Sequence, residues 1–259
     1  LLRICQLKFG SMTGPSGQKL RFAHVVVDEA QDLSPLSIQV LCGLVPPDGP
    51  VTLAGDTAQR LVLDNGFADW DELAERLHLK AHVLPPLAVT YRSTRQVMAL
   101  ARHVLGPLAR EEAPRDARDG APVELLRFPE QGEAVGFLAD ALKSLLARER
   151  RSTVALVART PEVADVYYQG LKRAQVPALR RVRQQDFDFS AGVDVTDVMQ
   201  IKGLEYDYVV ALEATAGHYP STDEARFQLH VIMTRAAHQL WLVCSDTPSL
   251  LLPESLTGA

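Results

Sequence analysis

The stretch VVVDEAQD, residues 25–32, places three β-branched residues directly before a cluster of carboxylates. The apolar run predicts a short buried strand. Ending such a strand in clustered negative charge costs free energy, because the carboxylates repel one another and lose solvation on burial. A bound cation would offset that cost. The stretch therefore predicts a cation site directly after a strand.

Strand-like and helical segments alternate along the rest of the chain. Strands are expected at 22–27, 51–54, 122–128, 153–158, 208–212 and 239–244, and helices from 34–35 onward and at 69–79, 133–150, 161–174 and 224–235. This alternation predicts an α/β fold with mostly parallel sheets. In such sheets, residues just past the carboxyl end of a strand project into the crevice where ligands bind.

The best candidate for a hinge is the proline pair Pro85 and Pro86, because proline cannot continue a helix and restricts the residue before it. The sequence therefore predicts a first domain over residues 1–86 and a second over residues 87–259. The chain begins at Leu1 and reaches strand-like residues almost at once, so we expect it to be a piece of a longer protein.

The composition is that of a globular protein, with 259 residues of which 47% are apolar and 23% are charged. Three cysteines without a close pair give neither a disulfide framework nor a zinc knuckle, so we expect a reducing compartment. No apolar run is long enough for a membrane span, and the expected location is the cytoplasm. The formal charge of −5 gives no reason to expect strong nucleic-acid binding from bulk electrostatics.

Asp28 and Glu29 would stand at the carboxyl end of the strand that Val27 completes. An apolar strand that ends in adjacent acids is how phosphate-transfer ATPases hold magnesium and position a water. In that arrangement the Asp reaches the ion and the Glu takes a proton from the water. The alternative is that both acids only cap the following helix.

The stretch LAGDTAQ, residues 53–59, repeats this design. A short apolar strand is followed by Gly55 for a tight turn and then by Asp56 and Gln59. The Gln59 amide has both a donor and an acceptor for a γ-phosphate or its water. Its spacing from DEAQD suits one intervening helix and a neighbouring strand. Taken alone, the pattern fits an ordinary turn equally well.

Two further stretches place arginines beside possible ligands. In TYRST, residues 90–94, Tyr91 can stack on a base and Arg92 can pair with phosphate oxygens. The alternative role of this stretch is helix capping by Ser93, and the two roles can coexist. In MTRA, residues 233–236, a helix carries Arg235 to its end, where we expect the side chain to emerge at an interdomain edge and to stabilise charge on a transferring phosphate.

The order of DEAQD, GDTAQ, YRST, KGLEYD and MTRA resembles motifs II to VI of UvrD/Rep-type superfamily 1 helicases. The resemblance covers most of the chain, from about residue 22 to residue 245. It implies two RecA-like domains, the first one incomplete, with ATP and Mg²⁺ in the cleft between them.

The resemblance also implies a role for each matching residue. Asp28 holds Mg²⁺, directly or through water, Glu29 is the catalytic base, and Gln59 is the nucleotide sensor. The remaining nucleotide contacts implied are Tyr91 on the adenine, Arg92 and Arg235 on the γ-phosphate, Glu205 on the ribose, and Gly55, Asp56, Lys202 and Gly203 around the nucleotide.

The sequence departs from this family in several places. No GxxxxGK[ST] loop occurs, so the phosphates lack their principal binding site, which must lie upstream in a longer parent or have been lost. We therefore expect this chain alone to hydrolyse ATP negligibly. The segment Arg60 to Gly66 lacks the aromatic ring that stacks on single-stranded DNA in the family, and Asp197 and Met199 replace a Thr and a His.

The function expected from the resemblance is a nucleic-acid-dependent ATPase that couples ATP hydrolysis to movement on DNA, with single-stranded DNA as the partner of the parent protein. The alternative is a compact HelD-like ATPase or regulatory module that acts on RNA polymerase or another protein. The segment without a ring favours the alternative, and the intact Glu29, Gln59 and Arg235 favour a working ATPase.

Other residues have simpler interpretations. His78 and His82 lack a nearby third ligand, which argues against a metal site there. Trp70 and Trp241 are expected in the core. The arginines of residues 180–183 can contact phosphates or form a solvated loop face, and the sequence leaves both open.

Overall fold

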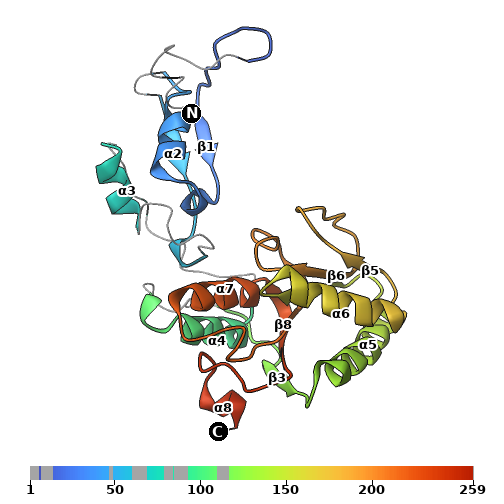
Figure 1. The fold of residues 1–259 in the computed structure, drawn as a ribbon. Helices are drawn as coiled ribbons and strands as arrows, with labels where there is room; N and C mark the ends of the chain where they lie inside the picture. Colours follow the sequence, from blue (N-terminus) through green and yellow to red (C-terminus); the bar gives the residue numbers. More distant parts are fainter. Residues whose placement is uncertain are drawn as a thin grey trace. The chain divides into compact units, whose positions relative to one another are not determined.

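The structure is a computed structural model that describes residues 6, 14–46, 49–59, 69–78, 84, 93–109 and 117–258. The chain forms two compact units, unit 1 over Leu1–Pro86 and unit 2 over Leu87–Ala259 (Figure 1). None of the helices within the described residues is long and apolar enough to cross a membrane.

Unit 1 is built around two parallel strands. Its elements are β1 (Val25–Val27), η1 (Ala30–Asp32), α2 (Pro35–Cys42), β2 (Val51–Leu53), η2 (Thr57–Gln59) and α3 (Trp70–Arg76). Val25 pairs with Val51 and Val27 with Leu53. The chain crosses from β1 to β2 through α2, as the motif spacing predicted.

The sequence explains where the helices of unit 1 begin. Ser34 is the N-cap of α2, its hydroxyl oxygen accepts a hydrogen bond from the Ser37 amide at 3.1 Å, and Pro35 occupies the first helical position. The Asp69 carboxylate caps α3 in the same way. Ile38 and Leu73 are buried, and Trp70 packs against them, which places this ring in the core as expected.

Unit 2 contains a six-stranded sheet in the order β3-β8-β7-β4-β6-β5, in which every pairing is parallel. Its strands are β3 (Glu124–Arg127), β4 (Thr153–Ala158), β5 (Leu179–Arg181), β6 (Gly192–Asp197), β7 (Tyr206–Ala211) and β8 (Ala236–Cys244). Its helices are α4 (Arg95–Leu105), η3 (Gly106–Leu108), α5 (Gln131–Arg148), α6 (Pro161–Arg173), α7 (Asp223–Met233) and α8 (Glu254–Thr257).

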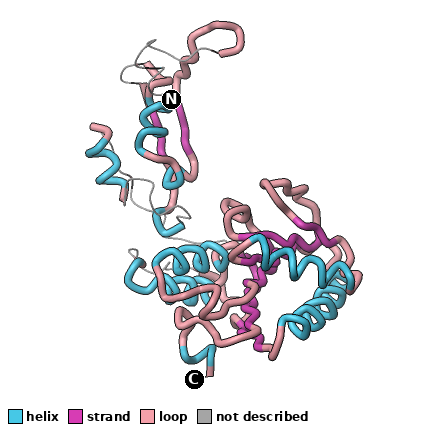
Figure 2. Tube along the Cα trace, viewed as in Figure 1, coloured by secondary structure: helices cyan, strands magenta, loops and turns pink. Residues whose placement is uncertain are grey.

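Helices cover both faces of this sheet. α4 packs beside α7 and α5 beside α6, and the strands run between the two pairs (Figures 1 and 2). β4 and β6 are almost entirely buried, as expected for parallel strands covered on two sides. The α/β class and the mostly parallel sheets predicted from the sequence are confirmed, and the arrangement is consistent with a RecA-like fold.

The sequence missed two strands of unit 2. β5 reads LRR and β6 reads GVDVTD, so neither shows the continuous apolar run that marked the other strands. Trp241 packs against the main core and lies 6.1 Å from the Phe137 ring, centroid to centroid. This position confirms the core role expected for Trp241.

Candidate functional site

In unit 1, the two acidic motifs lie side by side because they follow adjacent parallel strands. Asp28 and Glu29 come directly after β1, and Gly55 and Asp56 come shortly after β2. The amide of Ala30 donates to the carbonyl of Ala54 at 2.9 Å, which extends the strand pairing into both motifs. The chain thus brings the polar groups of both motifs to one edge of the strand pair.

Glu29 stands in a tight turn. Its φ of 51° lies in the left-handed region, which few residues other than glycine adopt. Its amide donates to Asp28 Oδ1 at 2.9 Å, and its carboxylate Oε2 accepts from Gln31 Nε2 at 2.6 Å. Although Glu29 precedes η1, its side chain makes no capping hydrogen bond. Capping therefore does not explain this acid, and such uncommon backbone conformations cluster at functional sites.

Gln31 joins the two motifs, and the sequence reasoning assigned it no role. Its side chain is fully buried, at 0% exposure. The amide oxygen accepts from the Asp56 backbone amide at 3.1 Å, and Asp56 Oδ2 accepts from Gln59 Nε2 at 2.8 Å. The only sequence signal for Gln31 was its place inside the DEAQD run.

Asp28 is the residue predicted to hold Mg²⁺. It is exposed at the carboxyl end of β1, and its Oδ1 accepts from the Glu29 amide at 2.9 Å. No group of three or more His, Cys, Asp or Glu side chains in the described part of the chain forms a metal cage. Mg²⁺ commonly uses one or two protein carboxylates together with waters and substrate phosphates, so a single exposed Asp suits such a site. His78 belongs to no described metal group, and His82 lies outside the described residues.

In unit 2, Arg235 holds two predicted motifs together at the amino-terminal ends of β7 and β8. Its side chain is 1% exposed, and its guanidinium donates to the carbonyls of Val231 and Leu204, each at 3.2 Å. The Arg235 carbonyl in turn accepts from the Tyr206 amide at 3.0 Å. The sequence led us to expect a projecting side chain, whereas here the guanidinium is folded into unit 2.

The KGLE stretch lies beside Arg235. Lys202 is half-buried and Glu205 is exposed. Gly203 has a φ of 78°, a conformation that glycine adopts without steric cost. The backbone of this stretch therefore turns sharply before β7 begins at Tyr206.

The YRST stretch contributes its last two residues to the same region. The Ser93 hydroxyl lies 3.5 Å from the Thr234 carbonyl, next to Arg235. The N-cap of α4 is Thr94, whose hydroxyl accepts from the Val97 amide at 3.4 Å, so the expectation that Ser93 caps this helix was wrong. Tyr91 and Arg92 lie outside the described residues, and their roles stay predictions.

Asp197 and Met199, which replace polar residues of the family, are joined to each other. Asp197 ends β6 and is buried, and its carboxylate accepts from the Met199 amide at 3.1 Å. Burial raises the pKa of the Asp197 carboxyl above its usual range. The Asp197 side chain is thus part of the fold of unit 2.

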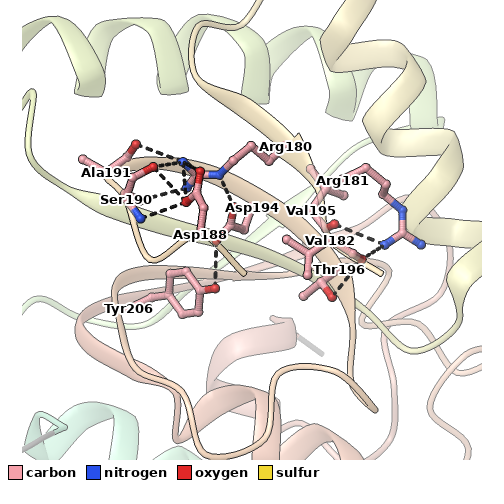
Figure 3. Close-up of polar contacts among 10 residues, drawn as sticks. All are labelled: Arg180, Arg181, Val182, Asp188, Ser190, Ala191, Asp194, Val195, Thr196 and Tyr206. Carbon is pink, nitrogen blue, oxygen red and sulfur yellow. Dashed lines mark hydrogen bonds and ion pairs between the residues drawn. The ribbon is translucent and has the colours of Figure 1, made fainter. Parts of the chain in front are cut away.

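The arginines of residues 180–183 are bound to carboxylates, and Figure 3 shows the contacts of Arg180 with Asp188 and Asp194. Arg180 donates to Asp194 at 2.6 Å, and both Arg181 and Arg183 donate to Asp165, at 2.7 and 2.8 Å. The hydrogen bond from Arg183 lowers the pKa of the Asp165 carboxyl. These ion pairs give the arginines a structural role, and the phosphate-contact interpretation gains no support.

Comparison with known proteins agrees with this geometry. Residues 192–243, from β6 to β8, match the family model of the UvrD-like helicase C-terminal domain. The crystal structure of the C-terminal domain of a possible DNA helicase from Lactobacillus plantarum WCFS1 is similar in fold, with 24% identity and a TM-score of 0.53. The similarity covers 65% of this chain and 97% of that one. No curated protein matches the chain.

The matched segment contains the KGLE stretch and Arg235, two of the motifs on which the resemblance was based. The chain is therefore a relative of UvrD-like helicases, and the resemblance inferred from the motif order is confirmed.

Proposed function

We propose that this chain is part of a superfamily 1 helicase that couples ATP hydrolysis to movement on DNA. The observation that carries the proposal is the pairing of β1 with β2, which places Glu29 and Gln59 on one hydrogen-bonded edge. A base and a water-orienting amide at neighbouring strand ends are the groups that phosphoryl transfer to water requires.

In this proposal the residues of unit 1 act on the attacking water. Glu29 accepts a proton from the water, and the Gln59 amide orients it. Asp28 would hold Mg²⁺, which when bound neutralises charge on the phosphates. The tight turn at Glu29 directs its carboxylate toward the side on which Gln31 and the motif after β2 lie.

The residues of unit 2 contact the nucleotide in the same proposal. Arg92 acts on the γ-phosphate, Tyr91 stacks on the adenine, and Glu205 binds the ribose. Arg235 is assigned to the γ-phosphate by the resemblance, and to reach it the guanidinium would have to leave the carbonyls of Val231 and Leu204. The sequence contains no Gly-rich phosphate loop, which either lies in a longer protein or has been lost. In this proposal a longer protein supplies the loop. We refer to that protein as the parent.

The test is Glu29→Gln in the parent. Because the change removes a proton acceptor and keeps the shape of the side chain, ATP binding should persist while turnover falls by about 10²–10⁴-fold. Equilibrium binding of a fluorescent ATP analogue and steady-state phosphate release measure the two effects. Near-parental turnover would show that Glu29 is not the base.

A second candidate function is an ATPase or regulatory module of the HelD type that acts on a protein. It is favoured by the burial of Asp197 and its hydrogen bond to Met199, at positions where the family carries Thr and His. A side chain bound within the fold in this way offers little to nucleic acid. The two candidates differ in the response of the ATPase to DNA.

A further inference from the structure

Gln31 is buried in unit 1, and both ends of its amide are used. Nε2 donates to the carboxylate of Glu29 at 2.6 Å, and Oε1 accepts from the backbone amide of Asp56 at 3.1 Å. A buried amide costs free energy unless it is hydrogen-bonded, so these contacts define one orientation of the side chain. Gln31 thus connects the end of β1 with the end of β2.

The chain after β2 is shaped to accept this amide. A Cβ atom added at Gly55 would lie 2.0 Å from Gln31 Oε1, closer than non-bonded atoms approach. A side chain at residue 55 would therefore displace the Gln31 amide from this position. This close approach of the chain after β2 is a second observation, besides the hydrogen bonds, that the Gln31 side chain has a defined position.

The contacts continue beyond Asp56. Its Oδ2 accepts from Gln59 Nε2 at 2.8 Å, so hydrogen bonds run from the Glu29 carboxylate through Gln31 and Asp56 to Gln59. These four residues form the path that joins the acid after β1 to the amide of η2.

We infer that Gln31 is a positioning residue that orients the Glu29 carboxylate toward its water and ties it to Asp56 and Gln59. The inference rests on the proposed function of Glu29 as the base. A donor on Oε2 restricts the rotamer of Glu29 and so sets the direction in which its carboxylate faces the water. Gln31 itself does not touch the reacting atoms.

The matched experiment compares Gln31→Met with Gln39→Met in the parent. Methionine keeps the unbranched length of glutamine but removes the amide, and Gln39, in α2 of the same unit, is the control. Gln31→Met should lower kcat by roughly 10–100-fold with ATP affinity nearly unchanged, because misplacing a catalytic group by about 1 Å costs on this order. Gln39→Met should leave both values at the parental level.

Gln31→Glu separates positioning from simple linkage of the strands. The introduced carboxylate still accepts from the Asp56 amide, but when ionised it cannot donate to Glu29. Positioning predicts that kcat falls as in Gln31→Met, and that the deficit shrinks at acid pH, where the introduced carboxyl group is protonated and can donate again. Parental kcat across the pH range would overturn the inference and leave only a strand-linking role.

Hydrogen exchange tests the same contacts in the present chain without activity. The Asp56 amide should exchange roughly two- to tenfold faster in Gln31→Met, the range expected for loss of one hydrogen bond, and should be unchanged in Gln39→Met. Parental exchange of Asp56 in Gln31→Met would overturn the inference.

The kinetic outcomes also separate this inference from the proposed function. If Glu29→Gln abolishes turnover and Gln31→Met does not, only the inference fails. If turnover is independent of Glu29, the proposed function fails and the inference falls with it.

Discussion

At the scale of single residues, buried polar side chains determine how the candidate site is organised. Gln31 and Arg235 are both almost completely buried, and each bonds to a backbone group of another motif. A buried amide or guanidinium must find partners, so each side chain fixes the position of the segment it contacts. The motifs are therefore held in place by residues that need not touch a ligand themselves.

Arg235 should contribute to stability as well as to any phosphate chemistry. Arg235→Ala removes the donor to the Leu204 carbonyl, whereas the Val231 carbonyl keeps the Thr234 hydroxyl as a donor, and an unsatisfied buried group costs about 1–3 kcal/mol. We expect a lower melting temperature of the chain by circular dichroism. An unchanged melting temperature would show that these hydrogen bonds add nothing to the stability of unit 2.

Asp197 should make stability depend on pH. The pKa of the Asp197 carboxyl is raised in the folded protein, so folding disfavours the ionised carboxylate. The carboxyl group therefore adds its full contribution to stability below the pKa of the unfolded state, and this contribution is lost as the pH rises through the pKa of the folded state. Asp197→Asn keeps an oxygen for the Met199 amide and removes the charge. It should raise the free energy of unfolding at pH 7, with little gain below the ordinary carboxyl pKa of about 3.9.

Urea denaturation of the parental chain and of Asp197→Asn, at pH 7 and below the ordinary carboxyl pKa, measures the difference in the free energy of unfolding. A variant that is equally stabilised at both, or destabilised at pH 7, would contradict the assignment of a burial cost to the Asp197 charge.

At the scale of elements, the ion pairs of β5 and β6 connect the sheet edge to the loop that follows. Arg180 donates to Asp194 and Asp188, and the Tyr206 hydroxyl donates to Asp194 at 2.9 Å (Figure 3). Tyr206 directly follows Glu205, so this network reaches the KGLE stretch. Burial raises the pKa of the Tyr206 hydroxyl, with the Asp194 charge adding to the shift.

Removing one partner of this buried pair should be costly. The Asp194 side chain is 4% exposed, and its loss leaves Arg180 Nε and the Tyr206 hydroxyl without this acceptor, while Arg180 keeps Asp188. Asp194→Ala should lower the free energy of unfolding by about 1–3 kcal/mol, as is typical when buried hydrogen-bonding groups lose a partner.

Arg183→Ala is the control for this prediction. Arg183 is 64% exposed although it pairs with Asp165, and exposed pairs contribute only about 0–1 kcal/mol. Urea denaturation of both variants provides the comparison. Equal losses would show that burial does not set the strength of these ion pairs.

The sequence predicted those elements whose signals are local. The adjacency of DEAQD and GDTAQ followed from two apolar strands with one helix between them, and the structure has this arrangement. The sequence did not predict β5 and β6 because their arginines and aspartates interrupt the apolar pattern. In the structure, ion pairs with residues distant in sequence hold these charges. The role of Gln31 was missed for a related reason, because the amide that it accepts from belongs to Asp56, after the neighbouring strand β2.

At the scale of the whole molecule, two features bear on function. The motif order and the matched segment relate the chain to UvrD-like helicases. The net charge of −5 gives no reason to expect strong nucleic-acid binding from bulk electrostatics. Binding to DNA therefore has to come from local contacts, including any made outside this chain.

The measurement that tests the central claim most directly is the steady-state ATPase of the parent with and without single-stranded DNA, at low and at physiological salt. A helicase of the UvrD type should show higher turnover with DNA at low salt. The effect should decline as salt rises, because contacts to phosphates release counterions. Parental turnover that does not respond to DNA even at low salt would contradict the claim that this chain belongs to a DNA-dependent motor.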